Sequence, residues 1–408
     1  MIYRKKQTST VSLNDENNIF LPQADVTVKD SNYGITSNVG NVRLIINNNI
    51  TVAFNGTAKD AAGINISQAE SQIFSSEVKK TTKVSFKSDS SDLINAYGWL
   101  CSKYSLNIGG SELLHNFNIS GEAVNGTARS FGFSCRGITS NAIFKSDFTV
   151  SAKGGKEAYA YAFYISGTVD LNTLSGKFTI SANSSPAGEA CGIYSTQGVF
   201  VDNITGSWNI TGKGKIKAYG IRAAGKTSIG NFAANMSVSG YESRAFYAEQ
   251  FSEKEDDKVF EAALLSGRIT VTAADSAYGI SSCGNALIGD MSAMNMKVTG
   301  KAANAYGIHI FSGEIENINP ENLIIAEGIL NVGSISVTAA ETACGIYVYD
   351  AIAAFTDKTV SDKEIKCHRI SGSITAKGKA ACGIEANSFT RTVKKNSKYI
   401  TFNTIYRI

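Results

Sequence analysis

The sequence predicts an all-β fold: a single-stranded parallel β-helix (β-solenoid) of about twelve coils, each 27–38 residues long. Three observations predict it. A four-residue motif, Ala-(Tyr/Cys)-Gly-Ile, recurs along the chain, and an alternating apolar and polar segment precedes most copies. The composition, with 38 Gly and only 3 Pro, favours strands and tight turns. Right-handed winding is predicted by analogy with the crossovers of parallel sheets.

The motif marks the coils because its third position returns at a nearly constant interval. Six copies are intact and six are degenerate, the latter with their third position at residues 34, 63, 98, 132, 162 and 247. The intact copies place a glycine there, and we interpret these glycines as structural: Gly192, Gly220, Gly279, Gly307, Gly345 and Gly383.

Each repeat holds three short strands, too few to bury an apolar face alone, so successive coils must stack. The strand before the motif alternates apolar with polar residues, as around Ile269 and Val271. We expect Tyr278 and Ile280 of the motif to point inward with these two residues. Gly279 between them is expected to allow close packing or a bend.

The repeats divide the chain into three parts. Residues 1–25 are interpreted as an N-terminal capping segment, and residues 26–390 as the solenoid. Residues 391–408 alternate like one more strand and are interpreted as a C-terminal strand or a truncated coil.

The imperfect coils of residues 26–390, rich in Gly, Asn, Ser and Thr, resemble the passenger regions of bacterial autotransporters and related β-helical adhesins. The resemblance implies a surface-exposed or secreted scaffold that binds rather than reacts. It implies as partner a host or cell-surface glycan or protein. The basic residues at positions 4–6 precede no apolar stretch, so we expect no signal peptide, and hence a fragment or another export route.

Composition excludes other partners. The net charge of +4 is small and dispersed, so no nucleic-acid partner is expected. No run of 18 apolar residues occurs, so no transmembrane helix is expected.

The sequence offers no constellation of catalytic groups. His115, His309 and His368 lie in different coils at different offsets from the motif, and we interpret them as isolated surface or loop histidines. We therefore expect no catalytic residue, no cofactor and no metal. The alternative function is a carbohydrate-active β-helix, a polysaccharide lyase or hydrolase or a phage tail fibre. A cleft lined by carboxylates or aromatics from three adjacent coils would favour it. A minor alternative, ice binding, follows from the polar residues that face outward before each motif.

The seven cysteines form no CxxC pair, so they do not follow a zinc pattern. Cys344 and Cys382 occupy the same motif position in consecutive coils, where Cys replaces an inward Tyr, and should stack. Cys101 and Cys135 should stack in the same way. Free thiols packed as apolar groups and disulfides both remain open.

Three inserted stretches after motif copies are the candidate binding loops. They should project from one sector, where repeat proteins often place such loops. No spaced Asp loop of the calcium-binding kind occurs in them. Their acidic residues are Glu253, Glu255, Asp256, Asp257, Glu314, Glu316, Glu321, Asp357 and Asp362.

Overall fold

The structure is a computed structural model. It describes residues 2–3, 9–13, 19–22, 24–29, 31–37, 43–66, 71–75, 78–89, 92–249, 259–284, 286–311, 315–318, 330–356, 370–395 and 398–407. Residues 1–222 and 238–241 form unit 1, and residues 223–237 and 242–408 form unit 2. The described residues contain strands, turns and bends but no helix, so no helix that could cross a membrane is found among them.

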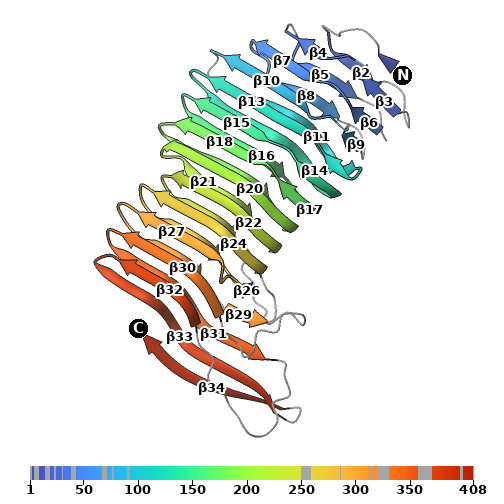
Figure 1. The fold of residues 1–408 in the computed structure, drawn as a ribbon. Helices are drawn as coiled ribbons and strands as arrows, with labels where there is room; N and C mark the ends of the chain where they lie inside the picture. The colour runs from blue at the N-terminus through green and yellow to red at the C-terminus, as the bar shows by residue number, and fades with distance from the viewer. Residues whose placement is uncertain are drawn as a thin grey trace. The chain divides into compact units, whose positions relative to one another are not determined.

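Unit 1 contains three stacks of parallel strands, here called the pre-motif, motif and post-motif ladders. The pre-motif ladder contains β4 (Val26–Val28), β7 (Ile50–Asn55), β10 (Lys80–Ser88), β13 (His115–Ala123), β15 (Phe148–Gly154), β18 (Lys177–Ser184) and the end of β20 (Val199–Gly214). Figure 1 shows these strands side by side.

The motif ladder of unit 1 contains β2 (Val11–Leu13), β5 (Tyr33–Ser37), β8 (Asp60–Ile66), the start of β11 (Leu93–Gly109), the start of β14 (Thr127–Lys145), β16 (Glu157–Ile165), β19 (Ala187–Ser195) and β21 (Lys217–Ala223). The post-motif ladder contains β1 (Ile2–Tyr3), β3 (Ile19–Pro22), β6 (Arg43–Ile46), β9 (Ser71–Ser75), the ends of β11 and β14, β12 (Glu112–Leu113), β17 (Val169–Ser175) and the start of β20.

Unit 2 has the same three ladders. Its pre-motif strands are the end of β24 (Phe260–Ala273), β27 (Met294–Gly300), β30 (Leu330–Ala339) and β32 (Ile370–Lys377). Its motif strands are β23 (Ser243–Ala248), β25 (Ala277–Ser282), β28 (Ala305–Ile310) and the starts of β31 (Thr342–Thr356) and β33 (Ala380–Lys395). Its post-motif strands are the start of β22 (Thr227–Gly240), the start of β24, β26 (Ala286–Asp290), β29 (Ile315–Ile318) and the ends of β31 and β33. The last strand, β34 (Lys398–Arg407), pairs antiparallel with β33.

The predicted all-β parallel solenoid is confirmed by this pairing of successive coils. The structure has about eight turns, fewer than the twelve coils that the motif copies predicted.

One motif copy was placed in the wrong register. The pairing sets Arg244 opposite Tyr278 and Phe246 opposite Ile280, so the third position of this coil is Ala245 rather than residue 247. An arginine where other coils have Tyr or Cys hid the true alignment.

The expected inward orientation of Tyr278 is also wrong. Ile280 is fully buried, whereas Tyr278 is only half-buried and its ring stacks on Tyr306 with centroids 5.5 Å apart. Ala277, Gly279 and Ile280 are all buried, so the strict alternation of a strand breaks at the glycine. The second motif position therefore faces outward.

The motif glycines form a column in which no larger side chain fits. A Cβ atom on Gly192 would lie 2.5 Å from the backbone oxygen of Gly220 in the next coil and 2.7 Å from the ring of Trp208. At Gly132 the corresponding distances are 2.5 Å to the Ala162 oxygen and 2.8 Å to the ring of Phe148. The glycines thus let the motif ladder approach both the next coil and the pre-motif side chains.

Large side chains of the pre-motif ladder occupy the space beside this column. In unit 1, rings in successive coils stack from Phe117 through Phe148 and Phe178 to Trp208, with centroids 4.8, 4.8 and 4.1 Å apart. All four are buried. Because each ring contacts its equivalents in neighbouring coils, the core continues along the ladder.

His115 belongs to this core, so its interpretation as a surface or loop residue is wrong. It is 1% exposed, and its Nε2 lies 2.8 Å from the Thr82 hydroxyl. Its ring contacts Trp99 and Phe117 with centroids 5.2 Å away in both cases. Burial lowers the pKa of His115 to about 3, so the ring is neutral in the folded protein.

The glycine column predicts a steric cost for Gly192→Ala. The methyl group overlaps backbone and Trp208, and overpacking of this kind costs about 1–3 kcal/mol. Gly56→Ala is the control, because Gly56 has no positive φ and a Cβ there would meet only the outer end of the half-buried Phe54 ring, which can shift. Thermal unfolding should place Gly192→Ala below Gly56→Ala. The reverse order would contradict the packing described.

The core histidine predicts a pH dependence. Between pH 6.5 and about 3 the unfolded His115 binds a proton that the folded residue does not. Stability should therefore fall as pH drops below 6.5, by up to about 1.4 kcal/mol per pH unit from this group. Urea unfolding at pH 4 to 7 should show a flatter profile for His115→Phe than for the wild type. Identical slopes would mean that His115 is not buried and neutral.

Candidate functional site

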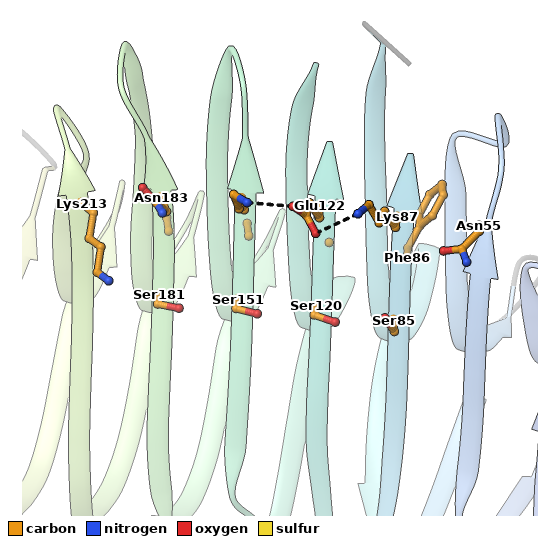
Figure 2. A pocket seen from close by; sticks show the side chains of 14 residues that line it. Asn55, Ser85, Phe86, Lys87, Ser120, Glu122, Ser151, Ser181, Asn183 and Lys213 are labelled. Carbon is orange, nitrogen blue, oxygen red and sulfur yellow. Dashed lines mark hydrogen bonds and ion pairs between the residues drawn. The ribbon is translucent and has the colours of Figure 1, made fainter. Parts of the chain in front are cut away.

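The outer face of the pre-motif ladder in unit 1 carries a shallow trough (Figure 2). It crosses six successive strands, from β7 to β20. Its floor is a line of serines, Ser85, Ser120, Ser151 and Ser181, and we call the whole feature the serine trough. The further residues that line it are Asn55, Phe86, Lys87, Gly121, Glu122, Ala152, Lys153, Ala182, Asn183 and Lys213.

The serines align because the coils stack in register. Ser85 lies opposite Ser120, Ser120 opposite Ser151, and Ser151 opposite Ser181. Their side chains face outward and are half-buried, while the flanking Val84, Phe86 and their equivalents point into the core. Serine is shorter than the residues two positions away, so the surface is lowest along this line.

A row of longer polar side chains lies two residues beyond the serines. The register pairs these residues in sequence: Asn55, Lys87, Glu122, Lys153, Asn183 and Lys213. All but Glu122 are exposed. Because neighbouring strands are about 4.8 Å apart, the three lysines recur about every 9.6 Å along the trough.

Glu122 lies between two of these lysines. Its carboxylate accepts a hydrogen bond from Lys153 Nζ at 2.8 Å and lies 3.9 Å from Lys87 Nζ (Figure 2). The hydrogen bond from Lys153, with the nearby positive charges, lowers the pKa of Glu122. The trough therefore presents an ionised carboxylate, hydroxyls, amides and ammonium groups, which suits binding of a polar ligand.

The motif ladder carries a second set of outward side chains, at the second and fifth motif positions. In a straight strand such residues would point to opposite faces. Here they converge: the rings of Tyr161 and Tyr164 have centroids 5.2 Å apart in unit 1, and those of Tyr306 and His309 lie 4.3 Å apart in unit 2. The strand bends between the two positions, at the glycine or at its equivalent, Ala162. We call these two lines of residues the outer columns.

Charged residues enter the outer columns beside the rings. In unit 1 the guanidinium of Arg222 forms an ion pair with buried Glu189 and lies 5.1 Å from the centre of the Tyr219 ring. In unit 2 the guanidinium of Arg244 lies 3.8 Å from the centre of the Tyr247 ring and pairs with Glu242 at 2.7 Å. Each guanidinium therefore has a carboxylate partner and an aromatic ring beside it.

His309 joins the outer column of unit 2, so its interpretation as a surface or loop residue is wrong as well. It is 6% exposed and packs between Tyr306 and Phe311. Burial and the charge of Arg244 lower its pKa to about 4. His368 lies outside the described residues.

The candidate binding loops are mostly outside the described part of the chain. This holds for Glu253, Glu255, Asp256, Asp257, Glu314, Glu321, Asp357 and Asp362. Glu316 is the exception and lies in β29, opposite Leu287.

The two cysteine pairs stack as expected. Cys344 lies opposite Cys382, and Cys101 opposite Cys135. None of these four cysteines forms a disulfide, and they are buried except for Cys382, which is partly exposed. Cys344 follows Tyr306 in the second-position column, so it replaces an outward rather than an inward Tyr.

The serine trough was only partly visible in the sequence. The polar ladder before the motif includes its serines, but exposed strands carry such residues ordinarily. The lysines two positions later gave no periodic signal because Asn and Glu separate them. No protein-family model matches the chain, nor does any curated protein or solved structure.

Proposed function

We propose that this chain is a non-enzymatic β-solenoid that binds an extended acidic glycan along the serine trough. The supporting observation is the recurrence of a lysine at every second coil, about 9.6 Å apart, beside a continuous line of serine hydroxyls. Display at a cell surface or in secreted form agrees with the resemblance to adhesins.

The spacing suits a glycan strand that runs across the coils. Two coils measure about as much as one disaccharide unit of an extended chain, so one acidic group per disaccharide meets one lysine. Serine hydroxyls and the Asn55 and Asn183 amides can both donate to and accept from sugar hydroxyls. An exposed, shallow and polar site of this kind favours modest affinity that grows with ligand length.

A carbohydrate-active enzyme is the rival. Most glycosidases act with two carboxyl groups, one of them a proton donor with a raised pKa. Among the described residues that line the trough, Glu122 is the only carboxylate, and its pKa is lowered. The lysines that rise beside the serines also leave no flat hydroxyl array of the kind ice binding needs.

If the trough binds the glycan, substitutions of two neighbouring residues should change the affinity in opposite directions. Lys153→Gln should weaken binding of a hyaluronan oligosaccharide, which carries one carboxylate per disaccharide, about two- to fivefold, since an exposed ion pair contributes about 0.5–1 kcal/mol. Glu122→Gln should strengthen it, because Glu122 competes with the ligand for Lys87 and Lys153. Isothermal titration at low salt measures both.

Lys145→Gln is the matched control, because Lys145 pairs with Glu112 away from the trough. It should bind like the wild type, and a neutral cello-oligosaccharide of equal length should bind none of the variants. Equal losses in Lys145→Gln and Lys153→Gln would remove the trough as the site. New reducing ends released from the glycan by the purified chain would overturn the non-enzymatic reading.

A further inference from the structure

Two cysteines and a glutamate meet in the outer columns of unit 2. Cys344 in β31 lies opposite Cys382 in β33 in the parallel register. Glu385 follows three residues after Cys382 on the same strand and lies opposite Tyr347. Sγ of both cysteines and a carboxylate oxygen of Glu385 lie within 4.8 Å of one another.

The bend at the motif glycine explains the convergence. Cys382 holds the second motif position and Glu385 the fifth, the same relation as Tyr306 and His309, whose ring centroids are 4.3 Å apart. A Cβ on Gly345 would lie 2.5 Å from the Gly383 oxygen, so the two coils approach closely at this bend. Stacking supplies one thiol from each coil, and the bend supplies the carboxylate.

We propose that Cys344, Cys382 and Glu385 bind a divalent cation of the zinc class. Zinc takes thiolate and carboxylate ligands in tetrahedral geometry. A Zn–S bond of about 2.3 Å puts two thiolates about 3.8 Å apart in such a site, a separation that neighbouring coils allow. Three protein ligands leave the fourth position to a water or an external ligand.

The surroundings favour a bound cation over two ionised thiols alone. Cys344 is fully buried, and its thiol donates a hydrogen bond to the Ile346 oxygen at 3.2 Å. Two thiolates and a carboxylate so close together need a positive charge to coexist, and a divalent cation supplies it while the thiol protons leave to solvent.

Unit 1 provides a matched control in Cys101 and Cys135. This pair also lies opposite in register and is buried. Among the described residues, Cys344, Cys382 and Glu385 form the one such cluster of three potential ligands. A metal that needs the carboxylate as well as two stacked thiols should therefore select the unit 2 pair.

The test uses the full chain, reduced and freed of metal, and titrates it with Co²⁺. Thiolate-to-cobalt absorption in the near ultraviolet should saturate at one equivalent, and Zn²⁺ should remove it. Cys344→Ser and Cys382→Ser should abolish the signal, Glu385→Gln should weaken Co²⁺ binding at least about tenfold, and Cys101→Ser should leave it unchanged.

Glu385→Gln keeps the test decisive if a cysteine variant fails to fold, because Glu385 is partly exposed and outside the core. Cobalt absorption that persists in Cys344→Ser, or that is equally strong in Glu385→Gln, would overturn the proposal. The proposal would also be overturned if the reduced, folded wild type took up no cobalt. Cys344 and Cys382 would then serve only as packing thiols.

Discussion

The close approach of successive coils at the motif glycine is the constraint on which the rest of the structure depends. At Gly132 and Gly192 a single added carbon would meet both the backbone of the next coil and a buried ring. Glycine there lets parallel strands pair at their ordinary spacing while Phe148 and Trp208 fill the core beside them. The aromatic stack and the outward bend are two consequences of the same missing side chain.

Because the coils stack in register, equivalent residues of successive coils align along the ladder. Ser120 has a serine on either side, so a shallow, polar surface extends over several coils rather than forming one enclosed pocket. The same rule places Cys344 against Cys382 although 38 positions separate them in sequence. The bend adds a second rule, since it brings positions three apart together on the outer face, as for Cys382 and Glu385.

The sequence predicted the features that follow from the repeat, but not the side-chain orientations that follow from the bend at the motif glycine. The recurring glycine was enough for the solenoid and for the two cysteine pairs. Tyr278 was placed inward because a regular strand alternates, and the break at Gly279 cannot be read from residue types. Arg244 stands where an aromatic was sought, so its coil was aligned two residues late. His115 looked like a surface residue because nothing local marks a histidine that stacks in the core.

Distances along the serine trough test the in-register stacking most directly. Positions 55, 87 and 213 are exposed and lie in β7, β10 and β20, so they can carry spin labels. Position 55 is five coil steps from position 213, and position 87 is four coil steps from it. Pulsed electron–electron double resonance should give backbone separations of about 24 Å between positions 55 and 213 and about 19 Å between positions 87 and 213. The two distances should differ by one strand spacing. Two equal distances, or an increment far from about 5 Å, would contradict the stacked coils from which the trough and the outer columns follow.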